Sequence, residues 1–391
     1  MTASSDLKAL WARADALGPK LTAWRRYLHR HPELAFEEVE SQRYVMAELR
    51  AMGLRPRAAA TTGVVVDIGE APFVMVRADM DALPVEEPEG FEFRSENPGV
   101  MHACGHDGHM AVALGTAQLL SERHGPGRHG YRVIFQPSEE RHPGGAPSMI
   151  AAGVLEGVSR VIGCHIRPAL AVGQVGAGEG AQSANSDRFS VTIVGRGGHG
   201  STPHLTVDPV PVACEAVLAV QSIVSRRVPS SQAAVVTVAM LEAGSAPNVI
   251  ADRATFHGTV RTFDPDVRDL VERSLGEICQ GVAAAHGARA EVSYRRGYPS
   301  LMNAPAETLA LRAVSDALLG PSAWTVEPRR MGGEDFAFYQ AERPGVFWSL
   351  GAALEGHPPA GHSSRFAFNE AALPIGVAVM TAGAEALAAL D

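Results

Sequence analysis

The chain has 391 residues, more than one ordinary hydrophobic core supports, so we expect more than one domain. Hydrophobic residues make up 46% of the chain and charged residues 20%, which excludes a disordered or fibrous protein. The formal net charge is −9 and the basic residues form no stripe, which argues against nucleic acid as a partner.

The N-terminal region predicts helices, and strands then alternate with helices. Apolar residues at helical spacing predict helices over 37–52 and 106–120. Short apolar runs predict buried strands at 73–76, 132–135 and 161–164. This alternation predicts an α/β fold in which flanking helices cover a mixed, largely parallel sheet.

The middle of the chain follows a different order. Six expected elements give the β-α-β-β-α-β pattern of a small separate domain: strand 189–194, helix 210–224, strands 234–240 and 254–260, helix 267–285 and strand 290–294. We therefore predict that residues 186–297 form a domain inserted into a larger one, which is made of residues 1–185 and 298–391. After the insertion the alternation resumes, with a helix at 306–319 and a strand at 346–350.

The two ends of the chain bear on localisation. The first twenty residues contain no apolar run after a basic start, so we expect no signal peptide and a cytoplasmic protein. Residues 371–390 have only Thr381 and Glu385 as polar residues and imitate a membrane span. The segment contains Pro374 and lacks basic or aromatic anchors at its ends, so we expect a buried helix and no membrane contact.

Four clusters of Cys, His and Glu have the side chains that bind metal ions. Three of them are Cys104-Gly105-His106, the pair Glu139-Glu140 after one strand, and His165 after another. The fourth is the loop 356–362, which ends at His362. Because ligand sites gather at the carboxyl ends of parallel strands, we expect these clusters to meet. The spacing of Cys104 and His106 is expected to point both side chains one way from an extended backbone.

Two pairs of carboxylates stand out. Adjacent residues at a strand end point in different directions, so one of Glu139 and Glu140 can bind metal while the other serves as general base. A solvated acidic turn would give the same pattern. Asp79 and Asp81 follow the strand at 73–76, where they fit either a simple turn or a role in orienting a metal ligand.

The sequence motifs of two other enzyme classes are incomplete or absent. Residues 195–200 match the G-x-G-x-x-G pattern of dinucleotide-binding folds, but Pro203 interrupts the helix that should follow. A dinucleotide fold would need an acid at the end of the next strand, but Glu215 falls inside the predicted helix, so we expect no nucleotide site. The absence of a G-x-S-x-G sequence argues against a serine hydrolase.

Taken together and in this order, the motifs resemble the M20 metallopeptidase family, specifically its amidohydrolase branch. The resemblance covers nearly the whole chain, in segments 26–34, 77–84, 101–109, 197–200, 248–250, 258–263, 333–336 and 365–370. It implies a metal-dependent enzyme that hydrolyses the amide bond of N-acyl amino acids. It also implies two divalent ions, held by Cys104, His106, Glu140, His165 and His362.

The resemblance also implies roles for residues around the metal centre. Glu139 would be the general base and later the proton donor, and Asp81 would support the metal site from behind. The inserted domain would be a lid that also joins two subunits into a homodimer or higher oligomer. In that domain His199 would steady the tetrahedral intermediate of a neighbouring active site, and Asn248 and Arg261 would help hold the substrate.

The chain departs from the family pattern beside the expected ligands. Ser138 stands where the family usually has Ala, and Arg141 and His142 precede the glycines that commonly follow at once. Arg167 replaces a residue that is often aromatic or Asn. These changes leave the metal site intact, but they leave the preferred acyl group and amino acid open.

Two related functions remain as alternatives. A dipeptidase or carboxypeptidase could use the same two-metal scaffold, although Cys104 favours the amidohydrolase branch, because the peptidase branches usually have a carboxylate there. A non-catalytic metal-binding protein would be expected to lack one of the two glutamates. Thiolate, imidazole and carboxylate ligands together suit Zn, Mn, Co or Ni.

Overall fold

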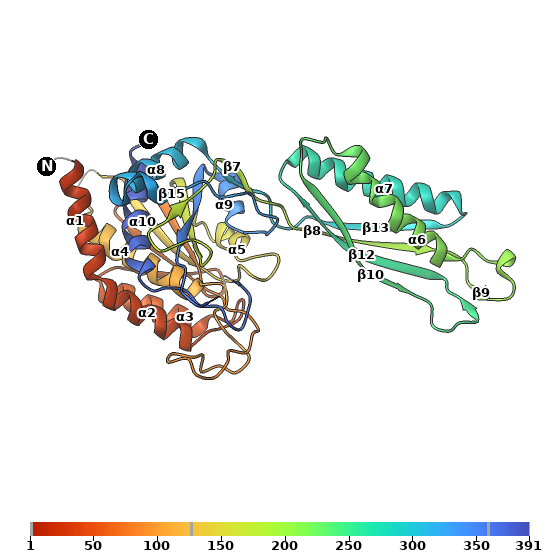
Figure 1. Cartoon of the computed structure of the whole chain (residues 1–391), viewed down its shortest axis with the longest axis horizontal. Coiled ribbons are helices and arrows are strands. Elements are labelled where there is room, and N and C mark those ends of the chain that lie inside the picture. The colour runs from red at the N-terminus through yellow and green to blue at the C-terminus, as the bar shows by residue number, and fades with distance from the viewer. Residues whose placement is uncertain (1–2, 126–127, 358–359, 391) are drawn as a thin grey trace. The chain divides into compact units, whose positions relative to one another are not determined.

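The computed structural model describes residues 3–125, 128–357 and 360–390. Contacts within the chain divide it into two compact units. The first unit comprises the described residues up to 180, residues 301–328 and those from 335 onward. The second unit comprises residues 181–300 and 329–334. The colours of Figure 1 follow the chain from one unit into the other and back.

The first unit is built on an eight-stranded mixed sheet. Its four central strands, in the order β4-β3-β5-β16, are mutually parallel. Strands β1, β2, β6 and β15 complete the two sides of the sheet. The strand bounds are β1 Arg57–Ala59, β2 Gly63–Ile68, β3 Phe73–Asp79, β4 Gly130–Gln136, β5 Val158–Arg167, β6 Val175–Gly176, β15 Trp324–Thr325 and β16 Gly345–Gly351.

Helices cover both faces of this sheet (Figure 1). Because successive side chains of a strand point to opposite faces, Val74 and Val76 of β3 join one apolar cluster, and Phe73 and Met75 join another. The first cluster packs against α1, α2, α4 and α10, and the second against α5 and α9. The helix bounds are α1 Ala3–Ala16, α2 Gly18–Arg30, α3 Val39–Ala51, α4 His106–Arg123, α5 Ala146–Ala151, α8 Pro305–Leu319, α9 Ala337–Glu342 and α10 Ala372–Ala388.

The second unit packs two helices against an antiparallel sheet of four strands, in the order β10-β12-β8-β13. A separate two-stranded ladder pairs β9 with β11. The bounds are β8 Asp187–Val194, β9 Gly198–His199, α6 Pro209–Val220, β10 Ala234–Ala243, β11 Val249–Ile250, β12 Arg253–Thr262, α7 Pro265–Ala285 and β13 Arg289–Arg295. Two further short strands are β7 Gly180–Ser183 and β14 Leu301–Asn303.

The α/β class with a largely parallel sheet is confirmed, and so is the buried C-terminal helix α10. Within the described ranges, no helix combines the length and the hydropathy of a transmembrane span. Several boundaries differ from expectation by a few residues. The helix expected to reach residue 224 ends at Val220, and a π-helical turn follows at Ile223–Arg227. Strand β5 continues through Arg167, so His165 lies inside it and not beyond its end.

Candidate metal centre

Three parallel strands bring the expected metal ligands to one edge of the sheet. Strand β3 leads to Asp79 and Asp81, β4 leads to Glu139 and Glu140, and β5 carries His165 near its carboxyl end. Because β3, β4 and β5 run in the same direction, these segments meet at a single edge. This is the arrangement by which open α/β sheets form their sites.

Cys104 and His106 are oriented by a sharp turn into α4. Gly105 has the left-handed conformation, with φ 97° and ψ 12°, and His106 is the first residue of the helix. This conformation favours glycine, because a side chain there is strained. The expected extended backbone between the two ligands is therefore wrong, and the turn at Gly105 is what lets both side chains converge.

The five expected ligands meet around the thiol of Cys104. One cluster of mutually close ligand atoms contains Cys104, His106 and His165, and a second contains Cys104, Glu140 and His362. The Cys104 Sγ lies 3.4 Å from Nε2 of His165. The Nε2 atom of His362 lies 3.1 Å from Oε1 of Glu140. These clusters place soft and hard donor atoms together, as a divalent transition metal requires.

The imidazoles of His106 and His165 have the ring orientation of metal ligands. The Nδ1 atom of His106 lies 2.8 Å from the carbonyl oxygen of Asp81, and Nδ1 of His165 lies 2.7 Å from that of Ile166. A carbonyl oxygen only accepts, so each Nδ1 carries a proton, and in the neutral ring, the form that binds metal, each Nε2 keeps its lone pair. In the described chain, Nε2 of His106 is buried without a hydrogen-bond partner. A metal ion would satisfy this atom, so the residues fit such an ion.

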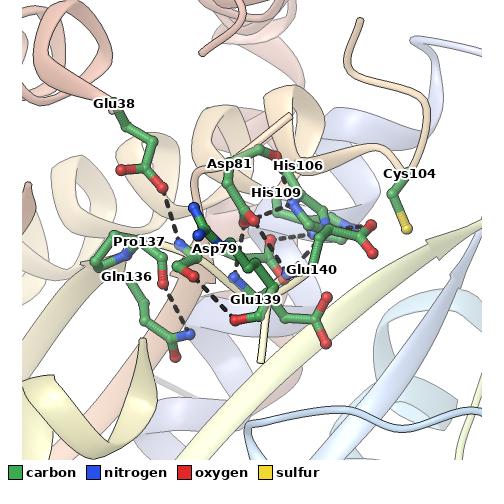
Figure 2. Close-up of polar contacts among 12 residues, drawn as sticks. Glu38, Asp79, Asp81, Cys104, His106, His109, Gln136, Pro137, Glu139 and Glu140 are labelled. Atoms are coloured by element: carbon green, nitrogen blue, oxygen red, sulfur yellow. Dashed lines mark hydrogen bonds and ion pairs between the residues drawn. The ribbon is translucent and has the colours of Figure 1, made fainter. Parts of the chain in front are cut away.

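Asp81 links three parts of the site. Its Oδ1 accepts the backbone N–H of Glu139 at 2.8 Å, and its Oδ2 accepts that of Glu140 at 3.0 Å. Its own carbonyl holds His106. Figure 2 shows Asp81 between His106 and the turn that carries the two glutamates. The buried Asp81 side chain therefore orients the two glutamates through their backbone, and both of its carboxylate oxygens accept hydrogen bonds in doing so.

The turn before the glutamates depends on a carboxylate that the sequence did not single out. Ser138 has a left-handed backbone with φ 54°, and its N–H donates to Oε1 of Glu38 at 2.9 Å. The other carboxylate oxygen of Glu38 accepts from Thr62, and burial raises the pKa of Glu38. Glu38 lies at the start of α3 and has no motif around it, so only the folded chain reveals its role.

A buried arginine organises the region behind the centre. Arg77 donates to Asp79 and to Asp335, each at 2.6 Å, and to Gln136 at 3.0 Å. Asp79 also contacts Nδ1 of His109 at 2.6 Å. Asp79, the last residue of β3, is therefore held by Arg77 and His109, and a role in orienting a metal ligand stays a prediction.

Two other histidines of the 101–109 segment do not project as ligands. Both ring nitrogens of His109 are engaged, Nδ1 by Asp79 and Nε2 by the N–H of Ile166 at 2.8 Å. His102 is buried, and this burial lowers its pKa to about 3. Neither ring nitrogen of the buried His102 has a hydrogen-bond partner among the described residues.

The start of α4 is anchored from α2. Arg25 Nε donates to Asp107 Oδ2 at 2.7 Å, and Nδ1 of His29 lies 2.9 Å from the same oxygen. Burial opposes the charge of Asp107, but Arg25 and His29 outweigh it and hold the pKa of Asp107 well below its usual range. These contacts fix the first turn of α4 and thereby the position of His106, the residue before Asp107.

The late loop contributes His362, whose backbone is also left-handed, with φ 59°. Its N–H donates to the carbonyl of Ala103 at 2.8 Å, which docks the loop beside Cys104. Pro358 and Pro359 of the same loop lie outside the described residues. Hydrogen bonds with Cys104 and Glu140 raise the pKa of His362 to about 10.

The remaining expected site residues belong to the second unit. His199 is exposed on β9, and its Nδ1 lies 2.8 Å from the Ser201 hydroxyl. The carbonyl of Asn248 accepts the N–H of Gly200 at 2.9 Å, so Asn248 lies beside His199. Arg261 is half-buried on β12, and burial lowers its pKa. The roles of these three residues in catalysis and binding stay predictions.

Comparison with known proteins identifies the family. The model of peptidase family M20/M25/M40 matches residues 75–386. N-acetylcysteine deacetylase of Bacillus subtilis is 39% identical over 92% of this chain and 94% of its own length. N-acyl-L-amino acid amidohydrolase of Geobacillus stearothermophilus is 43% identical over 74% of this chain and 79% of its own.

A solved structure points to the same family. A Bacillus subtilis protein described as a dinuclear metal-binding peptidase of the M20 family superposes with a TM-score of 0.86 at 34% identity. The match covers 96% of this chain and 99% of that one. The family model, the relatives along most of the chain and the shared structure lead to one conclusion: the chain belongs to peptidase family M20/M25/M40.

Proposed function

We propose that the protein hydrolyses the amide bond of N-acyl amino acids, with two divalent metal ions held by Cys104, His106, Glu140, His165 and His362. The observation that carries the proposal is the convergence of these side chains in two clusters that share Cys104. The relatives named as amidohydrolase and deacetylase support the substrate class. The donor set suits Zn, Mn, Co or Ni.

When bound, the ions would polarise the amide carbonyl and lower the pKa of the attacking water. Glu139 is placed to handle the proton. Its side chain is 8% exposed, and its carboxylate lies close to ligand atoms of His106 and Glu140. Its backbone N–H is fixed by Asp81 at 2.8 Å. We assign Glu139 as the group that accepts a proton from water as the oxygen attacks the acyl carbon.

The same residue completes the reaction. Glu139 returns its proton to the amide nitrogen as the carbon–nitrogen bond breaks, which releases a free amino acid and a carboxylic acid. In this proposal His199 donates a hydrogen bond to the oxygen of the tetrahedral intermediate, and Asn248 and Arg261 hold the substrate. The exposed His199 ring is available for this role, since only its Nδ1 is held by Ser201.

A substrate panel tests the proposal. We expect metal-reconstituted protein to release free amino acid from N-acetyl or N-benzoyl amino acids and to leave dipeptides largely uncut. Chromatographic quantification of the released amino acid measures both reactions in the same assay. Preferential cleavage of dipeptides would show instead that the scaffold serves a dipeptidase.

We further propose that the second unit joins two copies into a homodimer. Strand β10 lies at the edge of its sheet, and its residues Met240 and Leu241 are 53% and 47% exposed. Leu218 of α6 is 74% exposed. An unpaired, apolar strand edge on a folded unit is a pairing surface unless another chain covers it. A second copy of this chain offers the same surface.

Sedimentation velocity tests the dimer. We expect the wild-type protein to sediment as a dimer and Met240→Lys to sediment as a monomer, because a charge on an edge strand opposes strand pairing. Val326→Lys is the control, since Val326 is 72% exposed in the first unit and should leave the dimer intact. A monomeric wild-type protein would contradict the proposal.

A further inference from the structure

The side chain of His109 accepts a hydrogen bond from the backbone of β5 at a point where β5 no longer pairs with β3. Strand β5 pairs with β16 through Arg167, but its pairing with β3 ends where Arg77 faces Gly163. Beyond that point the N–H of Ile166 donates to Nε2 of His109 at 2.8 Å. Buried backbone donors need a partner, and here a side chain of α4 supplies it.

The geometry fixes the protonation of the His109 ring. An amide N–H only donates, so Nε2 of His109 must be the acceptor and Nδ1 must carry the ring proton. Nδ1 points at Oδ1 of Asp79, 2.6 Å away, and Oδ2 of Asp79 accepts from Arg77 at 2.6 Å. All three side chains are buried, which makes a rigid chain of contacts from Arg77 to the backbone of β5.

That backbone controls the direction of His165. The N–H held by His109 belongs to the peptide that joins His165 to Ile166, and the carbonyl of Ile166 accepts Nδ1 of His165 at 2.7 Å. The His109 ring also packs against the His165 ring, with centroids 4.8 Å apart and planes at 69°. Both contacts determine where Nε2 of His165 points, which is toward Sγ of Cys104 at 3.4 Å.

We propose that His109 is a positioning residue of the metal centre: by accepting the N–H of Ile166 it holds His165 in the orientation that binds an ion. The inference rests on the proposed metal centre, because it needs His165 to be a ligand. We do not assign His109 itself as a ligand, since both of its nitrogens are engaged by the protein. Figure 2 shows His109 beside Asp79 and His106.

Two substitutions separate the two contacts of His109. The amide oxygen of Gln reaches the place of Nε2, so His109→Gln can still accept the N–H of Ile166. The shorter Asn reaches the place of Nδ1, so His109→Asn can still donate to Asp79 but leaves Ile166 without an acceptor. Both variants lose the ring and its packing. A purely structural histidine would therefore respond similarly to both changes.

The experiment titrates metal-depleted, full-length protein with Co²⁺, followed by calorimetry and by visible absorption. We expect His109→Asn to lower the affinity for one of the two ions by about 10- to 100-fold, the usual effect of losing a group that orients a ligand. We expect His109→Gln to restore most of that affinity. Wild-type affinity in folded His109→Asn, or equal weakening in both variants, would overturn the inference.

Two further measurements keep the test decisive. His165→Ala must lose the same ion; if it binds Co²⁺ as wild type does, the metal-centre proposal fails. A defect in His165→Ala with none in His109→Asn overturns the His109 inference alone. Should His109→Asn not fold, ¹⁵N-isoleucine labelling reads the Ile166 amide directly. Slow hydrogen exchange in both wild type and His109→Gln supports the inference, and fast exchange in either overturns it.

Discussion

The substitution Glu139→Gln is expected to lower kcat by about 10³-fold or more while both ions stay bound, because the amide cannot accept the proton of the attacking water. Gln keeps the size of Glu and leaves the backbone N–H bonded to Asp81. Steady-state hydrolysis of an N-acyl amino acid, together with metal analysis of the purified variant, measures both parts of this prediction.

The neighbouring glutamate provides a matched control. Glu140 shares a cluster with Cys104 and His362, whereas Glu139 is grouped with Cys104 in no cluster of the described residues. We therefore expect Glu140→Gln to lose tight binding of an ion, and its low activity to recover partly in excess metal. Retained turnover in Glu139→Gln would contradict the assignment of Glu139 as the general base. Loss of metal from Glu139→Gln, with none from Glu140→Gln, would show that the two roles are exchanged.

The largest expected loss of stability comes from Arg77→Met. Removing the guanidinium leaves the carboxylates of Asp79 and Asp335 buried without their cation, which destabilises a protein by about 3–5 kcal/mol. Arg13→Met is the control in the same unit, because Arg13 and Glu122 form an exposed pair, 45% and 38% accessible, whose loss costs about 0–1 kcal/mol. Urea denaturation at neutral pH compares the two variants.

The stability lost in Arg77→Met is also expected to depend on pH. Burial opposes the charge of Asp79, but His106 and Arg77 outweigh it and hold its pKa well below the ordinary value. A depressed pKa contributes stability above the unfolded pKa of about 4, and that contribution is lost as the pH falls. The stability difference between wild type and Arg77→Met should therefore shrink below about pH 4. A difference that stays constant with pH would mean that packing, and not charge, is what Arg77 supplies.

The sequence led to the proposed ligands because metal chemistry restricts ligands to a few residue types. Cys104, His106 and the Glu139–Glu140 pair stand in short motifs, and His165 and His362 belong to the two other clusters of metal-binding residue types. The reason given for the convergence of Cys104 and His106 was wrong. Gly105 can adopt either sign of φ, so its left-handed turn is visible only in the folded chain.

Supporting residues were harder to predict, because their roles depend on partners far away in the chain. Glu38 bonds to Ser138 and Arg77 bonds to Asp335, and neither pair is marked by local spacing. His109 was correctly assigned to a helix, but its acceptor role requires knowing where β3 stops pairing with β5.

Some strands could be predicted from their sequence pattern, and others are too short to have one. The run of three valines in β2 is a clear strand signal, whereas β6 and β15 have two residues each, too few to show any period.

The docking of His362 against Ala103 has a consequence for biosynthesis. The Ala103 carbonyl and the Cys104 thiol leave the ribosome early, but the imidazole that completes their cluster is made only after the whole second unit. Closing such a long loop adds little cost, because loop entropy grows only with the logarithm of length. A growing chain can therefore fold much of its sheet and all of its second unit, and still cannot complete the proposed ion-binding cluster until His362 has been made.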